Sequence, residues 1–572
     1  MNNAITKSLV FLLLSSALFI SKAVGQITAT IDTSQKYQTV FGWGAGLRRC
    51  TNVFYEASPT VISKVEDLCF NQLHVNIVRT LCEATLEPVQ PTVVFPLDSA
   101  NLDWTYYDTM KIVYAVQRAQ TVSNGRINYV FSTNNSAPPW QKANHKVTWG
   151  DTILPSMYQH FVDFISYYML GMQNRYHLRL NGMSLFNEPG DSTDFETLSS
   201  SPVQVRDLVI KMKPRLDSME TVGMILHTDF ISPESPTVSG TNTSKVLGGS
   251  CIHYVDSAQN GLFADTAAVN SVDILGTHDY YDQGNTADWT GLKSVSMNKP
   301  IWVTEVCTGA CCPYDASSAN AVIQAKWIHR SFTLADARAF SMFSFYDTLP
   351  SDTPSVNIGA LVIFNNRTDS IIIPKRYYGY KQYVNFVRPG FVRVKSTSTN
   401  SSLSVTSFTN PLEDTLVIVA VNDSTGALTN VTFNCPSSDD SINQYVTSDV
   451  PDYNATQIAN ISPPASGQFT TGIEPMSITT FVIPYGVITG MKPDNNLANA
   501  IQIFPNPVTD KLIIQSAQKA IIEIFNVQGQ LVKSIASNGN KTNIDVSDLS
   551  SGVYVVQVKT KSGVVMMKVV KE

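Results

Sequence analysis

The chain has 572 residues, more than one compact core usually accommodates, so we expect two to four domains. Its composition, with 43% hydrophobic and 15% charged residues, is typical of a globular protein. The net charge of −6 argues against the basic surface that nucleic-acid binding requires.

The first predicted element is an export signal at the N-terminus. A lysine precedes an apolar run from Leu9 to Ile20, and the small residues Ala23 and Gly25 follow it. This order is typical of a secretory signal peptide that comprises residues 1–25. A membrane anchor is the alternative, but the run is shorter than the ~20 apolar residues of a spanning helix. No later stretch is long enough to span either, so we expect an exported, soluble protein.

Short β-rich runs alternate with amphipathic stretches over residues 41–375, and residues 26–40 precede them as a strand expected to join a side β-domain. Eight strands alternating with helices predict a (β/α)₈ TIM barrel with enlarged loops. The predicted strands are Thr39–Trp43, Val75–Thr80, Ile127–Ser132, Met183–Asn187, Val222–His227, Val272–His278, Pro300–Glu305 and Ala339–Tyr346. The predicted helices include Ser58–Phe70, Tyr106–Gln120, Tyr158–Tyr176, Val203–Met212 and Ala319–Leu334.

Polar side chains follow the last apolar position of most of these strands. In a (β/α)₈ barrel the catalytic residues lie at this carboxyl end. A single arginine or histidine at a strand end more often satisfies a neighbouring carbonyl group, so only several such residues together indicate a site. The residues in question are Arg79, the loop Ser132–Trp140, Asn187, Glu188, His227, His278, Tyr280, Glu305 and Tyr346.

Two further β-rich regions follow the barrel. Residues 376–485 contain short alternating runs, such as Leu416–Val421, among Ser, Thr, Asn and Asp turns, which predicts an antiparallel β-sandwich. Residues 486–498 are rich in Gly, Asn and Pro and predict a linker. Residues 499–572 have the pattern of a separate small β-sandwich.

The eight cysteines permit disulfides in an exported chain, but the sequence does not give their pairing. Cys307, Cys311 and Cys312 form a cluster for which a metal site is one interpretation. Because no histidine lies nearby, we expect no metal here.

Glu188 and Glu305 are the candidate catalytic residues. Glu188 follows the apolar run Met183–Phe186 and precedes Pro189, where the chain must leave the sheet, and Glu305 ends a second β-rich run. The fourth and seventh strands lie on opposite sides of a barrel, so their end residues can face each other. Hydrolysis of a glycosidic bond needs one carboxylic acid to protonate the leaving oxygen and one carboxylate to attack or to activate water. A separation of about 5–5.5 Å predicts retention of configuration, and roughly 6.5–9.5 Å predicts inversion.

Other residues are candidates for binding a sugar. Arg79 can hold one carboxylate ionised through charge-assisted hydrogen bonds, which lowers the pKa of that carboxyl group. Asn187 can donate a hydrogen bond to a sugar hydroxyl. Aromatic rings can stack on sugars, although ordinary packing explains any one of them equally well. These aromatic candidates are Trp140, Trp149, Tyr280, Tyr281 and Tyr346.

At these residues the sequence resembles a known family. Asn187-Glu188-Pro189 and Trp302-Val-Thr-Glu305 resemble the signatures of the clan of retaining (β/α)₈ glycosidases. Within it, residues 26–485 resemble glycoside hydrolase family thirty, which pairs the barrel with a side β-domain. The motifs that carry this resemblance are Phe41-Gly-Trp-Gly44, Asn135-Ser-Ala-Pro-Pro-Trp-Gln-Lys142, His278-Asp-Tyr280, Pro374-Lys-Arg-Tyr-Tyr378 and Phe386-Val-Arg-Pro-Gly390.

The resemblance implies a retaining mechanism with Glu188 as acid/base, Glu305 as nucleophile, and no metal or other cofactor. It adds His278 to the expected substrate-binding residues, beside Arg79, Trp140, Asn187, Tyr280 and Tyr346. Two departures leave the sugar open, because Thr133-Asn-Asn135 and Phe345-Tyr346 stand where family members often carry tryptophan.

The family's substrates include glucuronoxylan, β-1,6-glucan, β-1,6-galactan and glucosylceramide. Because an exported enzyme meets polymers, we expect a monomeric hydrolase of a wall polysaccharide. The alternatives are a glucosylceramidase-like or exo-acting β-glycosidase, a barrel that only binds polysaccharide, and an adhesin that acts through its β-domains. The chain lacks Gly-x-Ser-x-Gly, His-Glu-x-x-His and Gly-x-x-x-x-Gly-Lys motifs, which disfavours an esterase, a metalloprotease and an NTPase.

The C-terminal region also resembles a known family. Phe504-Pro-Asn-Pro507, Asn526-Val-Gln-Gly-Gln530 and Leu549-Ser-Ser-Gly-Val-Tyr554 resemble the type A C-terminal sorting domain of the type IX secretion system. The resemblance implies export across the outer membrane of a Bacteroidetes-type bacterium and an extracellular or cell-surface location. It also implies removal of the domain after export. A carbohydrate-binding module is the alternative.

Overall fold

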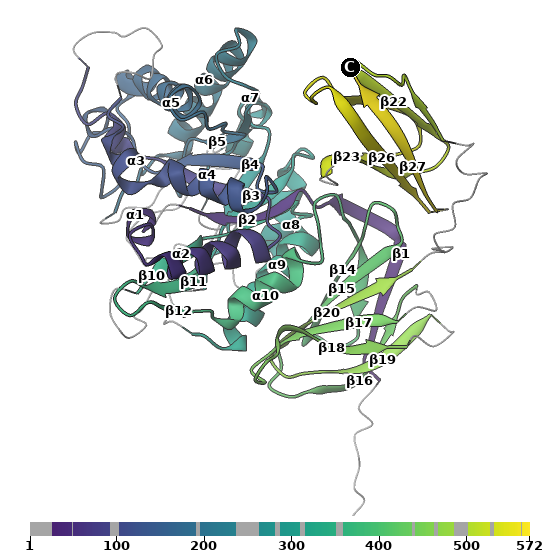
Figure 1. Cartoon of the computed structure of the whole chain (residues 1–572). Helices are drawn as coiled ribbons and strands as arrows, with labels where there is room; N and C mark the ends of the chain where they lie inside the picture. The colour runs from purple at the N-terminus through teal and green to yellow at the C-terminus, as the bar shows by residue number, and fades with distance from the viewer. Residues whose placement is uncertain are drawn as a thin grey trace, which may run out of the picture.

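A computed structural model of the protein describes residues 26–47, 50–91, 102–189, 195–235, 262–280, 286–308, 315–349, 359–436, 441–462, 467–485, 501–526, 531–561 and 563–572. The predicted signal peptide and linker lie outside these residues, as do Tyr281, Cys311 and Cys312. The chain forms a helix-covered barrel, a large and mainly antiparallel β-domain and a C-terminal β-domain (Figure 1).

Eight parallel strands form the barrel, in the order β6-β5-β4-β3-β2-β9-β8-β7. Bridges from Ile231 to Ile274 and from Ser235 to Thr277 join the two ends of this row and close it. The strands are β2 (Gly42–Gly46), β3 (Ile77–Cys82), β4 (Tyr129–Asn134), β5 (Gly182–Ser184), β6 (Asp229–Ile231), β7 (Leu275–His278), β8 (Ile301–Glu305) and β9 (Ala339–Met342). The predicted (β/α)₈ fold is therefore confirmed.

Helices surround these strands (Figure 1). They are α1 (Thr51–Phe54), α2 (Pro59–Glu66), α3 (Thr105–Met110), α4 (Ile112–Val122), α5 (Tyr158–Asn174), α6 (Pro202–Thr221), α7 (Thr266–Ser271), α8 (Thr286–Val295), α9 (Ser318–Leu334) and α10 (Lys375–Val384). Short helical turns are η1 (Asp67–Gln72), η2 (Ala84–Leu86), η4 (Pro139–Gln141), η5 (Pro155–Met157) and η7 (Leu262–Ala264). Within the described parts of the chain, no helix combines the length and the apolar character needed to cross a membrane.

Local sequence explains where the helices begin. At α2, the Ser58 side chain accepts a hydrogen bond from the Val61 N–H, and Pro59 occupies the first turn. At α6, Ser201 caps the Gln204 N–H in the same way, and Pro202 follows it. Each Ser-Pro pair thus satisfies one of the unpaired N–H groups at a helix start.

Aromatic side chains fill the amino-terminal half of the barrel. Trp302 packs against Phe41 and Tyr129, with ring centroids 4.6 and 5.2 Å apart. Ile77 and Phe131 belong to the same buried cluster. Because this half is filled with apolar groups, the polar side chains of the strands gather at the carboxyl end.

The predicted fifth strand is wrong in position. Helix α6 continues to Thr221, and the chain turns at Gly223, whose φ is 75°. Strand β6 therefore begins only at Asp229. His227 precedes the strand, its side chain is 69% exposed, and its Nδ1 lies 3.0 Å from a Glu220 oxygen. The prediction that His227 lies at the catalytic rim is therefore incorrect.

The predicted eighth strand is two strands in the structure. β9 stays in the barrel, and the chain breaks at Phe343. β10 (Ser344–Thr348) then leaves the barrel and pairs with β11 (Ala360–Asn365), which also pairs with β12 (Ser370–Ile372).

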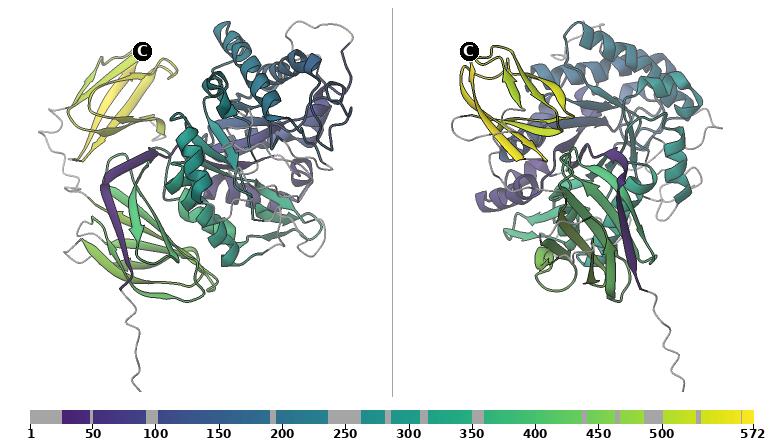
Figure 2. Two further views of the ribbon diagram at one scale, coloured as in Figure 1. Left: turned by 180° about the vertical axis from the view of Figure 1, so that it is seen from behind. Right: turned by 90° about the vertical axis from the view of Figure 1, so that its right-hand side faces the viewer.

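The side β-domain is a nine-stranded sheet folded around its own apolar core. Its first strand, β1 (Thr28–Thr39), pairs antiparallel with β13 and parallel with β16, and Figure 2 shows it in purple beside the green strands. The others are β13 (Val392–Ser398), β14 (Leu403–Thr409), β15 (Thr415–Asn422), β16 (Leu428–Asn434), β17 (Ile442–Thr447), β18 (Asn454–Ile461), β19 (Gln468–Ile473) and β20 (Ser477–Pro484).

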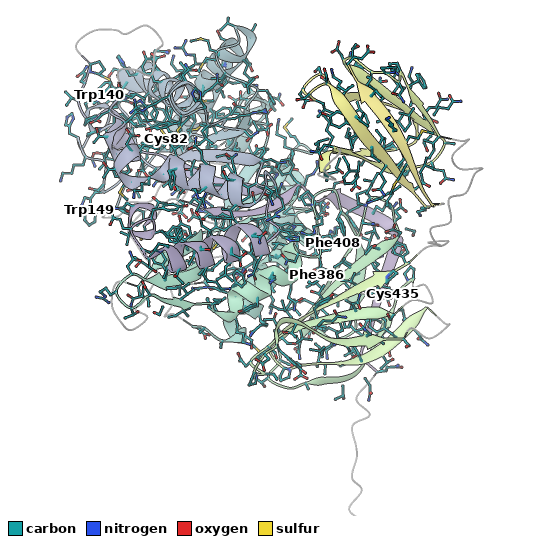
Figure 3. All side chains as sticks on the ribbon, in the orientation of Figure 1. Cys82, Trp140, Trp149, Phe386, Phe408 and Cys435 are labelled. Atoms are coloured by element: carbon teal, nitrogen blue, oxygen red, sulfur yellow. The ribbon has the colours of Figure 1, made fainter. Side chains whose placement is uncertain are left out.

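This β-domain packs on α9 and α10 of the barrel. Phe408 of β14 contacts Phe332 of α9 edge to face, with centroids 6.0 Å apart, and Figure 3 labels Phe408 where the two parts meet. Val417, Val419 and Ile478 join the same apolar cluster as the barrel. The shared core fixes the β-domain to the outside of the barrel.

The C-terminal β-domain consists of two sheets around a third core. One sheet has three strands, β21 (Gln502–Phe504), β22 (Lys511–Ser516) and β25 (Asn540–Asp545). The other has four, β23 (Ala520–Asn526), β24 (Leu531–Ser537), β26 (Gly552–Thr560) and β27 (Gly563–Lys571). This arrangement confirms the small β-sandwich predicted for this region.

The contacts of Trp43 on β2 generate a stability prediction. Its ring is fully buried and stacks on Phe332 at 5.2 Å, and its Nε1–H donates to the Val387 carbonyl at 2.7 Å. We predict that Trp43→Ala lowers the free energy of unfolding of the barrel by about 3–5 kcal/mol. Thermal or urea denaturation followed by fluorescence measures this loss. Trp149→Ala, at a residue that is 57% exposed, is the control, and an equal loss in both variants would contradict the assignment.

Candidate active site

Glu188 and Glu305 come together at the carboxyl end of the barrel. A carboxylate oxygen of each, with one ring nitrogen of His278, forms a group in which all three atoms lie within 4.8 Å of one another. Glu305 is buried, and the Glu188 side chain is 13% exposed. This short separation matches the carboxylate pair of a retaining glycosidase better than the wider pair of an inverting one.

The backbone around Glu188 is held in an unusual conformation. Glu188 has a φ of 46°, which is rare for a residue with a side chain. Its N–H donates to the Glu234 carbonyl at 2.8 Å, and the Asn187 N–H donates to the Asn134 carbonyl at 2.9 Å. These bonds to the segments on either side keep Glu188 in place immediately after β5. Residues in such sparsely populated conformations cluster at functional sites.

A bulge in β8 directs Glu305. Thr277 pairs with Val303, but His278 pairs with Glu305, so Thr304 is an extra residue in β8. Trp302 faces the barrel interior, and strict alternation would turn Glu305 to the opposite face. The extra residue reverses this alternation and lets both side chains point inward.

Arg79 at the inner face of β3 connects residues of three other strands. Its Nη1 donates to Glu305, its Nε donates to Glu234 at 3.1 Å, and its Nη2 donates to Asn187 at 2.6 Å. Burial acts to lower the pKa of Arg79, but the charges of Glu234 and Glu305 outweigh it and raise that pKa above its ordinary value. Arg79 is therefore a buried cation that stabilises the carboxylate form of Glu305.

His278 and Tyr280 contact the two candidate glutamates from the end of β7. The Nδ1 of His278 lies 2.7 Å from Glu188 Oε1, and its Nε2 lies 3.3 Å from Glu234 Oε2. The Tyr280 hydroxyl donates to Glu305 Oε1 at 2.7 Å. Burial acts to lower the pKa of His278, but the charge of Glu305 and the hydrogen bonds to Glu188 and Glu234 raise it to about 9. This upward shift of the pKa favours the protonated form of His278 at neutral pH.

Glu234 was missed in the sequence. It follows β6, is fully buried, and accepts hydrogen bonds from Arg79, His278 and the Thr133 hydroxyl. Burial acts to raise its pKa, but the charge of Arg79 and the bond from His278 lower it, so the carboxylate is ionised. The apolar pair Phe230-Ile231, followed by Pro233, could have indicated that Glu234 stands at a strand end, because Glu188 also follows an apolar run.

Glu188, His278 and Glu305 also have the composition of a metal-ligand set. Both ring nitrogens of His278 already face carboxylate oxygens, and the positively charged Arg79 guanidinium donates a hydrogen bond to Glu305. A divalent ion would have to displace these bonds and approach two cations. The geometry therefore favours a network of hydrogen bonds over a metal centre.

The predicted aromatic residues do not all reach this site. Tyr346 lies on β10, outside the barrel, and is only 1% exposed. Its ring packs against Phe54, Phe70 and Phe364, so it offers no face to a sugar, which corrects the prediction. The reason is the break after β9, which turns β10 into a different sheet.

Trp140 and Trp149 occupy the loop after β4 and are labelled at the same edge of the barrel in Figure 3. Trp140 lies in η4, partly buried, with its ring 5.4 Å from His160 of α5. Trp149 is 57% exposed and has a φ of 62°. In the described residues neither has a recorded contact with the glutamates, and their binding of sugar stays a prediction.

Among the cysteines that the structure describes, Cys69, Cys82 and Cys435 are buried thiols outside any disulfide. Burial raises the pKa of all three, to about 12 for Cys435. They behave as apolar core residues. The cluster that contains Cys311 and Cys312 lies outside the described residues.

Comparison with known proteins identifies the C-terminal region. Residues 502–572 match a family model described as "Secretion system C-terminal sorting domain". This match confirms the predicted sorting domain, and with it export to the cell surface or the extracellular space.

The barrel and side β-domain resemble glycoside hydrolases. The glucuronoxylanase XynC of Bacillus subtilis (strain 168) is 25% identical over 251 residues, which cover 43% of this chain and 54% of the relative. The chain thus spans about half the length of the curated relatives it matches. A glycoside hydrolase family 30 subfamily 8 xylanase from Clostridium acetobutylicum has a TM-score of 0.59 and 22% identity, covering 80% of this chain and 99% of that one.

A solved endo-β1,6-glucanase has a TM-score of 0.57 and 16% identity, and the match covers 81% of this chain and 96% of that one. At these identities the solved structures establish a shared fold. The resemblance extends over the barrel together with the side β-domain.

The charge of His278 generates a testable prediction, with His329 as an internal control. His329 is also buried, with its Nδ1 2.7 Å from the Thr406 hydroxyl, but burial and the nearby Arg393 lower its pKa to about 4. We predict that ¹⁵N NMR at pH 7 shows His278 protonated on both nitrogens and His329 neutral. A neutral His278 at pH 7 would contradict the network described above.

The same shift predicts how stability depends on pH. The folded-state pKa of His278, about 9, lies above the ordinary 6.5, so the protonated form favours folding. Its contribution to the free energy of unfolding should be complete below pH 6.5 and lost as the pH rises through about 9. Denaturation of the wild type and of His278→Gln across this range measures it. A difference between the two proteins that does not change with pH would contradict the prediction.

Proposed function

We propose that this protein is a secreted, retaining β-glycoside hydrolase that acts on a wall polysaccharide. The observation that carries the proposal is the separation of Glu188 and Glu305, whose carboxylate oxygens lie within 4.8 Å. Arg79 and Tyr280 hold one of these groups and His278 holds the other, so the two carboxyls have different surroundings. Different roles for two carboxyls require such a difference.

In the first step, Glu305 attacks the anomeric carbon and the glycosidic bond breaks, while Glu188 gives its proton to the leaving oxygen. Hydrogen bonds from Arg79 and Tyr280 to the two oxygens of Glu305 orient the nucleophile. Arg79 and His278 carry two positive charges, which balance the carboxylates of Glu234 and Glu305.

In the second step, Glu188 takes a proton from a water molecule, and the water oxygen attacks the anomeric carbon. The bond from that carbon to Glu305 breaks, and the Glu305 carboxylate is restored. Two displacements on the same carbon return the sugar to its original configuration. Asn187, held by Arg79 at 2.6 Å, keeps its amide N–H groups for a sugar hydroxyl.

For the substrate class we propose glucuronoxylan first, with β-1,6-glucan and β-1,6-galactan as the next candidates. The curated relative is a glucuronoxylanase, and one structural neighbour is an endo-β1,6-glucanase. The predicted signal peptide and the sorting domain support secretion through the type IX machinery. We propose that the secreted enzyme is a monomer. A barrel that only binds polysaccharide is the second candidate, although it would not need two adjacent, differently held carboxyls.

The stereochemistry of the product tests the retaining mechanism. We predict that ¹H NMR of the earliest product from the best substrate shows the β-anomer, before mutarotation forms the α-anomer. The test panel is glucuronoxylan, β-1,6-glucan, β-1,6-galactan and aryl β-glycosides. Initial release of the α-anomer would contradict the assigned roles, and binding without turnover on all substrates would favour the binding protein.

The two glutamates should respond differently to substitution. In Glu188→Ala, we expect turnover of substrates with poor leaving groups to fall about 10²–10⁴-fold, because general acid catalysis is lost. Aryl glycosides with acidic phenols need no proton, so they should lose less, and added azide should restore turnover by replacing water. Glu305→Ala should lose turnover on both kinds of substrate.

The control for this pair is Glu66→Gln, at a buried glutamate of α2 that pairs with Arg118 and lies outside the site. It should keep wild-type turnover on every substrate. The assigned roles would be reversed if azide restored turnover in Glu305→Ala and formed a β-glycosyl azide there, while Glu188→Ala formed no β-glycosyl azide.

A further inference from the structure

The carboxylate of Glu234 contacts several groups of the site but is not exposed to solvent. Its residue is fully buried, below the partly exposed Glu188. Its Oε2 accepts from Arg79 Nε at 3.1 Å and from His278 Nε2 at 3.3 Å, and its Oε1 accepts from the Thr133 hydroxyl. All the described polar contacts of this side chain are thus with groups of the site.

The two cations that Glu234 contacts each bind one of the candidate catalytic glutamates. Arg79 donates to Glu305, and His278 lies 2.7 Å from Glu188. A continuous path of contacts therefore runs from Glu305 through Arg79, Glu234 and His278 to Glu188. Glu234 accepts hydrogen bonds from both cations through the same oxygen, Oε2.

The backbone of the same residue also positions Glu188. The Glu188 N–H donates to the Glu234 carbonyl at 2.8 Å, and the Glu234 N–H donates to the Phe186 carbonyl at 2.9 Å. Main chain and side chain of Glu234 thus support the same catalytic group from two directions. Two separate sets of hydrogen bonds, one from the main chain and one from the side chain, therefore connect Glu234 to the site.

We propose that Glu234 is a positioning residue, which holds Arg79 against Glu305 and His278 against Glu188. This role rests on the proposed function of the two glutamates. Glu234 takes no part in bond making or breaking. It acts by fixing the geometry and charge of groups that touch the reacting atoms.

Removal of its charge should change His278 in a specific way. The charged or titratable groups that face the His278 imidazole are Glu188, Glu234 and Glu305, with the ring of Tyr280 at 5.7 Å. Asp279, its neighbour in sequence, turns to Arg330 at 3.1 Å. Without the negative charge of Glu234, the group that faces His278 Nε2 is uncharged, so the protonated imidazole is stabilised less.

Glu234→Gln tests the proposal, because it keeps the size of the side chain and removes the charge. We expect kcat on the best substrate to fall about 10²-fold, the effect of a catalytic group displaced by ~1 Å. KM should change little, because Glu234 is buried and does not contact the sugar. In ¹⁵N NMR, the pKa of His278 should fall below about 9.

Three companion variants separate positioning from general destabilisation. Glu234→Asp keeps the charge and should retain a His278 pKa near that of the wild type and recover part of kcat. Thr133→Val removes only the hydroxyl that donates to Glu234 Oε1, and it should lower kcat several-fold. This variant tests the proposal if Glu234→Gln does not fold. Glu66→Gln breaks the ion pair between a buried glutamate and the partly exposed Arg118, and should leave kcat and the His278 titration unchanged.

Folded Glu234→Gln with wild-type kcat and an unchanged His278 pKa would overturn the proposal. An equal loss of kcat in Glu66→Gln would also overturn it. If the wild type hydrolyses no glycoside, the proposed function fails, and the His278 titration still decides whether Glu234 controls the charge of that residue.

Discussion

The burial of the Arg79 guanidinium is the constraint on which the rest of the site depends. Arg79 is 1% exposed, and an unpaired charge at such depth costs several kcal/mol. It is compensated by Glu234, Glu305 and Asn187, which follow or end three different strands. The barrel must therefore close with these strands in register. The same pairing of Arg79 stabilises the fold and sets the geometry of the site.

The apolar and polar halves of the barrel have complementary roles. Trp302 and Tyr129 belong to the buried apolar cluster of the amino-terminal half, beneath the charged groups. Above them, negative and positive groups alternate from Glu305 to Glu188. Electrostatic interactions are strong in such a poorly solvated site, and preorganised charges of this kind are the largest contribution to many enzymatic rate enhancements.

Much of this arrangement could be predicted from the sequence, for identifiable reasons. Glu188 and Glu305 each stand at the end of a short apolar run, and this local pattern is sufficient to predict that they lie at the carboxyl end of the barrel. Tyr346 has the same local pattern, but the chain leaves the barrel after Phe343, and only the pairing of β10 with β11 shows this. Glu234 was missed because α6 extends to Thr221 and moves the fifth strand by several residues. The bulge at Thr304 also depends on pairing with β7 and has no signature within β8 itself.

If the proposed mechanism is correct, Glu305 forms a covalent bond with the sugar, while Glu188 and the buried charges beneath support the reaction. Mass spectrometry of the protein after incubation with 2-deoxy-2-fluoro aryl β-glycosides of xylose, glucose and galactose tests this directly. The fluorine slows both steps, but the activated phenol still leaves quickly. The covalent intermediate of the first step should therefore accumulate. We expect the intact protein to gain the mass of one fluorosugar and the labelled peptide to carry it on Glu305. A label on Glu188 or Glu234, or no label from a protein that turns over the matching glycoside, would contradict it.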